Sequence, residues 1–540
     1  MVKKVFADLT KEDKQYIAQI YYEEGMNHKE KMEILTKKFG VSPRTIRRWW
    51  KDKLNLSELY SRLPQQLIVA SNKEIDEDTK MLLVTSAQNK TGVFNEALNN
   101  MIAYAKYWTD KGIKTQIVVA PTRYRNPTSQ TESMFSKKDS VEEWWRDEVK
   151  DYLYYGKIQF GDVVISSDSR VIPTAKNPLN GYEAMAKDNH LIIPHSKINW
   201  QTLPRFKNRP LRTMCTTGFI THKNYSDSKA GDLGAIHHVY GFVVIEKKED
   251  DTCHIPRNVR ITSDGSFIDL IYEVKNGKIS TINSSKGFVW GDLHANEVNE
   301  EILKLTIDLC SYLKPEKQII HDAFNGSTVN PHEKKDMFIQ RQKIIKGEHL
   351  IEEEIEETFN LIDVIKDLVG AETYISISNH DIFLDRYIND ENWKRDLHNS
   401  PAYLKYAYIQ QTVDLTQYGG LFGYLVDDRF GEDVTYINYG DSLEIENFEV
   451  GLHGDFGVNG ARGNYRTFNK LNTKMIHGHQ HSPVIKDNVT CVGVTCELDQ
   501  YYTRRGLSSW AHAHSVIHNN GKNQLICFGD DYKFTNLIEL

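Results

Sequence analysis

The chain has 540 residues, of which 40% are hydrophobic and 26% charged, and its formal net charge is -7. One hydrophobic core rarely supports such a length, so we expect two or three domains of a globular protein. The negative charge excludes a general nucleic-acid-coating protein, which would be strongly basic. Any contact with nucleic acid must therefore come from a local patch.

Cysteine usage and hydropathy indicate the compartment. The six cysteines form no CxxC pair, which favours reduced thiols in a hydrophobic core. The first residues lack the apolar stretch of a signal peptide, and no window approaches the about 18 apolar residues of a membrane span. We expect a cytoplasmic protein that does not bind membranes.

Residues 1–56 form a short basic unit, with 13 Lys and Arg against 8 Asp and Glu. Ser42 and Pro43 suit the N-cap and the first position of a helix, and Gly40 suits the tight connection before it. The pattern predicts three helices, over Lys11–Glu24, Lys29–Phe39 and Pro43–Leu54. This is the layout of a helix-turn-helix unit.

The third predicted helix carries the polar residues expected of a DNA-reading surface, namely Arg44, Thr45, Arg47, Arg48 and Lys51. The unit resembles the helix-turn-helix units of transposases and homeodomain-like regulators. That resemblance implies that the helix enters the major groove while its Arg and Lys side chains contact phosphates. The alternative is a small protein-docking bundle with solvated charges.

Residues 57–79 are predicted to be a linker, and residues 80–285 an α/β middle region. The middle region opens with a βαβ pattern, over Met81–Ala87, Val93–Lys111 and Lys114–Ala120. Further strands are expected at Asp162–Ser166, His190–Pro194, Met214–Thr221 and Val239–Glu246, with turns at Ser263-Asp264-Gly265 and Asn276-Gly277. Its polar clusters match no motif with a known mechanism, so we expect a structural or substrate-guiding role.

Residues 286–540 contain an ordered set of Asp, Asn and His residues, each following a predicted strand. The set comprises Gly291-Asp292-Leu-His294, Asp322 with Asn325, Asn379-His380-Asp381, His453, and Gly478-His479-Gln-His481. A helix over Val298–Leu313 separates the first two motifs, and this β-α-β spacing predicts that Asp322 lies beside Asp292 at one sheet edge. A helical insertion is expected over residues 331–369. Carboxylate and imidazole ligands suit Mn, Fe or Zn.

As a set, these motifs resemble the calcineurin-like metallophosphoesterase family over about residues 286–490. The resemblance implies a β-sandwich flanked by helices and two divalent metal ions, most simply Mn, with Fe or Zn as alternatives. It places one ion on Asp292, His294, Asp322 and His481, and the other on Asp322, Asn379, His453 and His479. His321 and Ser378 stand where the family has Gly.

His380 has no place among the implied ligands. It could protonate the leaving oxygen as a general acid, and we expect Asp381 to orient it. Two cations bound about 3.5–4 Å apart clamp a phosphate and lower the pKa of a bridging water, so the expected reaction is phosphoester hydrolysis.

The basic N-terminal unit favours DNA as the substrate and partner. The catalytic motifs resemble those of DNA-repair nucleases, and the whole chain, including the strand ending at Gln88, loosely resembles the pre-early DNA-transfer nucleases of tailed phages. That likeness implies a Mn-dependent DNase that degrades host DNA in an infected bacterial cytoplasm. The alternatives are a phosphatase or small-nucleotide phosphodiesterase, and a DNA-binding assembly protein with an inactive metal centre. A homo-oligomer is left open, since no heptad or apolar patch requires one.

Overall fold

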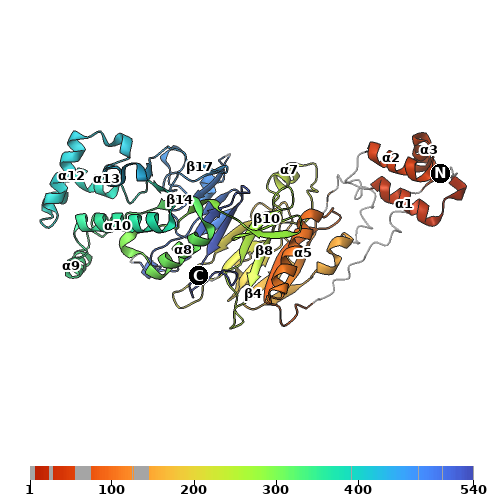
Figure 1. The fold of residues 1–540 in the computed structure, drawn as a ribbon, viewed down its shortest axis with the longest axis horizontal. Coiled ribbons are helices and arrows are strands. Elements are labelled where there is room, and N and C mark those ends of the chain that lie inside the picture. The colour runs from red at the N-terminus through yellow and green to blue at the C-terminus, as the bar shows by residue number, and fades with distance from the viewer. Residues whose placement is uncertain are drawn as a thin grey trace.

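The structure is a computed structural model in which α/β layers lie between two helical ends (Figure 1). It describes residues 6–22, 28–54, 74–124, 126, 145–331, 333–390, 392–471, 473–500 and 503–538. Most of the predicted linker, residues 57–73, lies outside this described part. Among the described residues, no helix is long and apolar enough to cross a membrane. All six cysteines are buried and free of disulfides, as expected.

The N-terminal helices pack around a small core of their own, which includes Met32, Leu35 and Phe39 on one face of the second helix. The elements are η1 (Phe6–Asp8), α1 (Lys11–Tyr22), α2 (His28–Phe39), α3 (Pro43–Arg48) and a π-helical turn η2 (Trp49–Lys53). The predicted cap is confirmed, because the Ser42 side chain accepts a hydrogen bond from the Thr45 amide. The third helix is shorter than predicted and continues as η2.

A four-stranded sheet, in the order β2-β1-β8-β9, opens the middle region. Its elements are β1 (Met81–Gln88), α5 (Asn95–Asp110), β2 (Thr115–Thr122), β8 (Gly241–Glu246) and β9 (Arg257–Arg260). Strands β1 and β2 pair in parallel from Met81 opposite Thr115, and α5 crosses over between them. The predicted βαβ unit is therefore confirmed.

A three-stranded antiparallel meander follows, formed by β10 (Phe267–Asp269), β11 (Tyr272–Lys275) and β12 (Lys278–Thr281). Asn276 and Gly277 connect the last two strands, both with positive φ (51° and 72°). Two such residues form the hairpin turn that matches the twist of the strands. This turn was predicted from the Asn-Gly pair.

A ten-stranded sheet joins residues from both sides of position 285, in the order β17-β18-β19-β21-β20-β6-β7-β5-β4-β3. Its strands are β3 (Lys157–Phe160), β4 (Val163–Ser166), β5 (His190–Ile193), β6 (Asn199–Thr202), β7 (Thr213–Thr216), β17 (Glu444–Ile445), β18 (Phe448–Glu449), β19 (Lys474–His477), β20 (Val484–Lys486) and β21 (Val489–Cys491). The junction is the antiparallel pair of β20 and β6, with Val484 opposite Gln201. Ranges 80–285 and 286–540 thus share one sheet.

A six-stranded sheet, in the order β16-β15-β14-β13-β22-β23, positions most of the predicted ligands. Its strands are β13 (Ser285–Val289), β14 (Pro315–His321), β15 (Glu372–Ser376), β16 (Val434–Ile437), β22 (Ala513–Ile517) and β23 (Asn523–Cys527). Strands β13 to β16 pair in parallel. Their carboxyl ends therefore meet along one edge.

Both faces of this sheet are covered, because neighbouring strand residues point to opposite sides. On one face, helices α8 (Glu300–Leu313) and α10 (Ile351–Val369) pack in a core with Phe288, Ile320 and Ile375. Their neighbours Val289, Ile319 and Tyr374 pack instead against residues of the ten-stranded sheet, such as Ile476. The chain is thus a mixed α/β protein in which two sheets pack against each other and helices cover the outer face.

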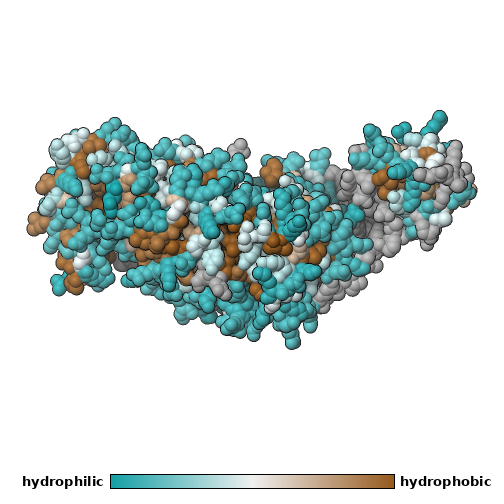
Figure 2. All heavy atoms as spheres, viewed as in Figure 1, coloured by the Kyte–Doolittle hydropathy of each residue, from teal (hydrophilic) through white to brown (hydrophobic). Residues whose placement is uncertain are grey.

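The helical insertion predicted over residues 331–369 contains α9 (Met337–Lys346) and α10. A second helical segment, which was not predicted, lies between β15 and β16 and contains α11 (Phe383–Asn389), η5 (Asn392–Arg395), α12 (Ser400–Thr412), η6 (Leu415–Tyr418), α13 (Leu421–Phe430) and η7 (Gly431–Asp433). Figure 2 shows apolar residues exposed at this end of the molecule, over α9 and α12. The remaining short helices are η3 (Asp147–Tyr152), α6 (Glu183–Ala186), α7 (Lys229–Ile236), η4 (Ala295–Glu297), η8 (Val458–Gly460), α14 (Tyr465–Phe468) and η9 (Thr503–Arg505).

Candidate metal centre

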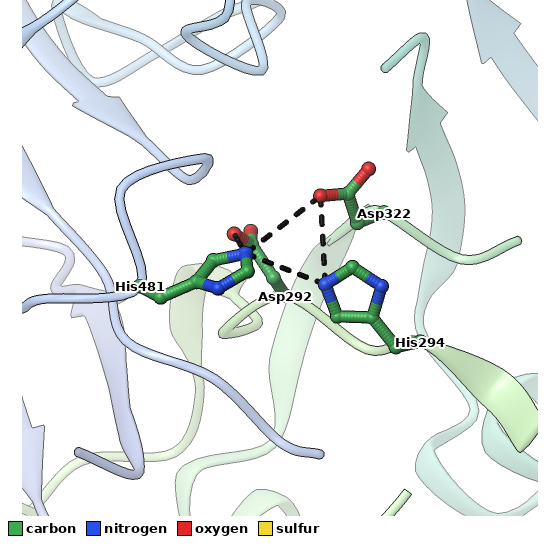
Figure 3. A group of neighbouring side chains, drawn as sticks. All are labelled: Asp292, His294, Asp322 and His481. Carbon is green, nitrogen blue, oxygen red and sulfur yellow. Dashed lines mark hydrogen bonds and ion pairs between the residues drawn. The ribbon is translucent and has the colours of Figure 1, made fainter. Parts of the chain in front are cut away.

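Four of the predicted ligands form one compact, buried cluster, namely Asp292, His294, Asp322 and His481. Figure 3 shows the four side chains pointing toward one another. One ligand atom from each residue lies within 4.8 Å of the other three. His481 Nε2 is 3.0 Å from Asp292 Oδ2 and 3.3 Å from His294 Nε2. This arrangement of oxygen and nitrogen atoms could hold a metal ion.

The cluster is assembled at the ends of three strands. Asp292 and His294 follow β13, Asp322 follows β14, and His481 follows β19. Backbone hydrogen bonds tie the first two loops together, since His294 N donates to Asp322 O at 2.8 Å. The predicted neighbourhood of Asp292 and Asp322 at one sheet edge is therefore confirmed.

Four of the predicted ligands have a left-handed backbone. Their φ angles are 48° at His294, 46° at Asp322, 71° at His479 and 58° at His481. Residues other than glycine rarely adopt this conformation, which costs free energy and is concentrated at functional sites. The fold therefore maintains strained turns that aim these side chains inward.

The other predicted ligands gather around Asp322. His453 Nε2 lies 3.2 Å from Asp322 Oδ2, and the rings of His453 and His479 are 5.2 Å apart. Asn379 and His479 line the same cleft as Asp322. The structure thus brings all seven predicted ligands to one region, with Asp322 next to both groups.

The centre holds two buried carboxylates, and among the described residues neither Asp292 nor Asp322 forms an ion pair with Lys or Arg. Burial would raise the pKa of Asp322, but the neighbouring His453 holds it well below its usual value. Burial would lower the pKa of His453 and His481, but these carboxylates raise it to about 10 and about 8. Positive charge is therefore stabilised here, and a divalent cation would supply it in place of protons.

Several buried polar atoms of the centre have no hydrogen-bond partner among the described residues. These are Asp292 Oδ1, Asp322 Oδ1, Asn379 Oδ1 and His453 Nδ1. Buried polar atoms normally find a partner, so a group of unpartnered ligand atoms in one place calls for an explanation. Coordination of cations would satisfy them, and the residues therefore fit a metal centre.

Asn325 holds two histidines of the centre in position. The His294 Nδ1–H donates to Asn325 Oδ1 at 3.2 Å, which leaves Nε2 free to face the cluster. The His380 Nδ1–H donates to the backbone oxygen of Asn325 at 2.6 Å. Asn325 was noted as part of a motif but not predicted as a site residue, although its spacing from Asp322 was a usable signal.

His380 lies at the cleft, with its ring centroid 4.8 Å from that of His294. The expectation that Asp381 orients it is wrong. Asp381 Oδ2 accepts hydrogen bonds from Ser378 N and the Tyr436 hydroxyl instead. Burial raises the pKa of Asp381 to about 8. The orienting group for His380 is the Asn325 carbonyl, and Asp381 shapes the turn.

The two positions that depart from the family pattern are both buried. Ser378 Oγ accepts hydrogen bonds from the amides of His380 and Asp381, so its hydroxyl closes the turn that presents Asn379 and His380. The centroid of the His321 ring lies 5.5 Å from that of the His453 ring, and neither of its nitrogens has a hydrogen-bond partner in the described part of the chain.

The centre opens into a cleft of about 850 Å³. Besides Asp322, Asn379, His380, His479 and His481, it is lined by Asn330, Glu333, Phe383, Arg462, Gly463, Asn464, Gln480 and Trp510. The ring centroids of Trp510 and His481 are 4.1 Å apart, and Arg462 is exposed. Sequence reasoning did not predict Trp510 or Arg462 as site residues, since each comes from a loop outside the motifs.

Gly478 has no side chain, and the space beside its Cα is filled by the Asp292 carboxylate. A Cβ atom at position 478 would lie 2.1 Å from Asp292 Oδ1. Gly478→Ala should displace this carboxylate and weaken metal binding by about 10–100-fold, as measured by calorimetric titration. Gly506→Ala is the matched control, because no atom of the described residues lies within 4 Å of the added Cβ. Equal metal affinity in both variants would contradict this assignment of Asp292.

The predicted DNA-binding residues lie on α3 and η2. The side chains of Arg44, Arg47, Arg48 and Lys51 are exposed and therefore accessible to a ligand. Thr45 is half-buried, and its hydroxyl forms a hydrogen bond with the Ser42 hydroxyl. Thr45 therefore takes part in the helix cap, and the DNA contacts of the four basic residues stay a prediction.

Comparison with known proteins finds a phage relative. The chain is 27% identical over 476 residues to Protein A1 of Escherichia phage T5, an alignment that covers 83% of this chain and 82% of that protein. No protein-family model matches the chain, and no solved structure matches it. The similarity to a phage protein agrees with the phage part of the expected resemblance.

Proposed function

We propose that this protein is a metal-dependent DNase of the metallophosphoesterase type. The observation that carries the proposal is the position of Asp322, whose Oδ2 lies 3.7 Å from His294 Nε2 and 3.2 Å from His453 Nε2. In this position, the Asp322 carboxylate would be available to both groups of ligands. Bound there, two divalent cations would clamp a phosphodiester and supply hydroxide at neutral pH.

The residues of the chain take distinct roles in this proposal. One cation would be held by Asp292, His294, Asp322 and His481, and the other by Asp322, Asn379, His453 and His479. His380, fixed through Nδ1 by Asn325, has Nε2 left to donate a proton to the leaving oxygen. The mixed oxygen and nitrogen ligands suit Mn, with Fe or Zn as alternatives.

Three observations support DNA as the substrate. The exposed cations of α3 and η2 suit phosphate contacts. Arg462 lines the metal cleft, where it can contact a phosphate of the bound strand. The similarity to a phage protein suits an enzyme that degrades host DNA in the bacterial cytoplasm.

The decisive experiment is digestion of circular and linear DNA by the full chain with Mn²⁺ and with EDTA. Cleavage with Mn²⁺ that EDTA abolishes is the expected result. Hydrolysis of a small chromogenic phosphodiester without DNA cleavage would instead indicate a phosphatase or small-nucleotide phosphodiesterase. Retained DNA binding with neither activity would indicate an assembly protein with an inactive centre.

The N-terminal unit should contribute phosphate contacts that depend on salt. Replacing both Arg47 and Arg48 with Ala should lower the slope of log affinity for duplex DNA against log salt by about two units, since each lost contact contributes about one. Filter binding over a range of salt concentrations measures this slope. Replacement of two exposed cations elsewhere, Lys106→Ala and Lys304→Ala, is the matched control. An unchanged slope in the Arg47 and Arg48 variant would assign DNA contacts to other parts of the chain.

A further inference from the structure

A second cleft of about 640 Å³ adjoins the metal cleft, and Phe383 lines both. Its walls come from the loop after β14, from α11 and from η5. Lys334 and Lys335 stand on the first wall, Arg386 on the second, and Arg395 on the third. The two clefts therefore border the same side chain, whose ring centroid lies 4.8 Å from that of the candidate general acid His380.

Helix α11 links the two clefts. It begins at Phe383, three residues after His380. The second cleft is lined by its residues Phe383, Arg386 and Tyr387 and by its C-cap Asp390. This spacing of three and four residues places them on one face of the helix. A ligand that lies over His380 can therefore continue along the same helix into the second cleft.

The second cleft carries unpaired positive charge. Lys334 Nζ lies 2.7 Å from Asp396 Oδ2, so these two opposite charges pair with each other. Lys335, Arg386 and Arg395 are exposed, and within the part of the chain that the structure describes none of them has an ion-pair partner. Asp390 is the remaining carboxylate of the lining. Three free cations against one anion favour a polyanionic ligand.

Apolar and aromatic groups alternate with these cations. Leu397 is 84% exposed beside Arg395, and the exposed ring of His398 follows it. Grooves that bind single-stranded nucleic acid combine cations for the phosphates with flat or apolar groups for the bases. A small phosphate ester would not need this length of mixed lining beyond the metal centre.

We propose that the second cleft binds the single-stranded nucleic-acid segment that flanks the bond cleaved at the metal centre. Arg386 and Arg395 contact its phosphates, and Leu397 and His398 contact its bases. This inference rests on the proposed nuclease function, because it assigns the substrate segment next to the same centre. It implies that a strand must be separated from its complement, or be single-stranded, where it passes α11.

The test compares two double variants of the full chain. Arg386→Gln with Arg395→Gln removes two free cations of the cleft, and Lys304→Gln with Arg341→Gln removes two exposed cations of α8 and α9 outside it. The probe is a fluorescent single-stranded octanucleotide in EDTA, so that binding is measured without cleavage. The cleft variant should bind about tenfold more weakly, with the salt slope lowered by about 1.4 for two lost contacts on a single strand, while the control stays within about twofold of the unmodified chain.

Equal affinities of the two double variants would overturn the cleft assignment, and circular dichroism of both excludes misfolding as the cause of a difference. A parallel incubation of the unmodified chain with the same strand and Mn²⁺ tests the proposed function separately. If the cleft variant binds more weakly but the unmodified chain does not cleave the strand with Mn²⁺, the nuclease proposal is contradicted and the binding site is supported. If the Arg386 and Arg395 double variant cleaves the strand as fast as the unmodified chain, the cleft assignment alone is contradicted.

Discussion

Asp322→Asn should abolish DNA cleavage and remove bound metal, the largest effect expected of any single replacement. The amide lacks the negative charge that one carboxylate offers to two groups of ligands, and Asp322 lies within 4 Å of both His294 and His453. Loss of several kcal/mol of charge stabilisation corresponds to a decrease of at least about 10³-fold in kcat/KM. Digestion kinetics and elemental analysis of the purified variant measure both losses.

The same replacement should also reduce the stabilisation of the folded protein by Mn²⁺. At about 100 times its Kd, Mn²⁺ should stabilise the unmodified protein by about 2.7 kcal/mol for each bound ion, and Asp322→Asn should lose most of this gain. Asp110→Asn is the matched control, since Asp110 is exposed at the end of α5. If Asp322→Asn kept its metal and its metal-induced rise in Tm, the shared-ligand arrangement would be wrong.

The carboxyl ends of the central strands of the six-stranded sheet could be predicted because they are buried on both faces. Pairs such as Phe288 and Val289 face opposite cores, so the end of the strand appears in the sequence as a short apolar run. Helix α12 was not predicted, because its sequence shows no clear helical pattern of apolar residues. Tyr403 and Tyr406 are buried while Leu404 and Tyr408 are exposed, so its apolar residues do not form one stripe.

The ten-stranded sheet could not be predicted from local patterns. Its junction pairs Val484 with Gln201, residues that are far apart in the chain, and the register is set by packing against other elements. Periodicity identifies that a segment is a strand but not which strand lies beside it. The sequence boundary at residue 285 was drawn from a change of pattern, and a shared sheet leaves no trace in such a pattern.

The ligand set was implied by the resemblance to the metallophosphoesterase motifs, and the β-α-β spacing alone predicted that Asp292 and Asp322 meet at one sheet edge. The orientation of the His380 ring could not be predicted from the sequence. The group that fixes it is the backbone carbonyl of Asn325, which every residue type possesses and no motif reveals. Asp381 was the plausible neighbour in the sequence, but its carboxylate accepts from Ser378 and Tyr436 within the turn.

His380→Ala should lower the rate of DNA cleavage by about 10²–10⁴-fold, the range expected when a general acid is removed. Bound metal should stay near the level of the unmodified protein, because His380 Nδ1 binds the Asn325 carbonyl and the proposed ligand set does not include this residue. Single-turnover cleavage and elemental analysis separate the two effects. His222→Ala, at an exposed histidine outside the metal cleft, is the control.

The leaving group distinguishes a general acid from a residue that merely supports the fold. The sugar oxygen released from DNA is a poor leaving group and needs a proton, whereas a nitrophenolate leaves readily without one. His380→Ala should therefore impair DNA cleavage far more than hydrolysis of a nitrophenyl phosphodiester at the same metal centre. Equal losses on both substrates, or loss of metal, would make His380 a ligand or a structural residue, and the proton would then have to come from another group in the cleft.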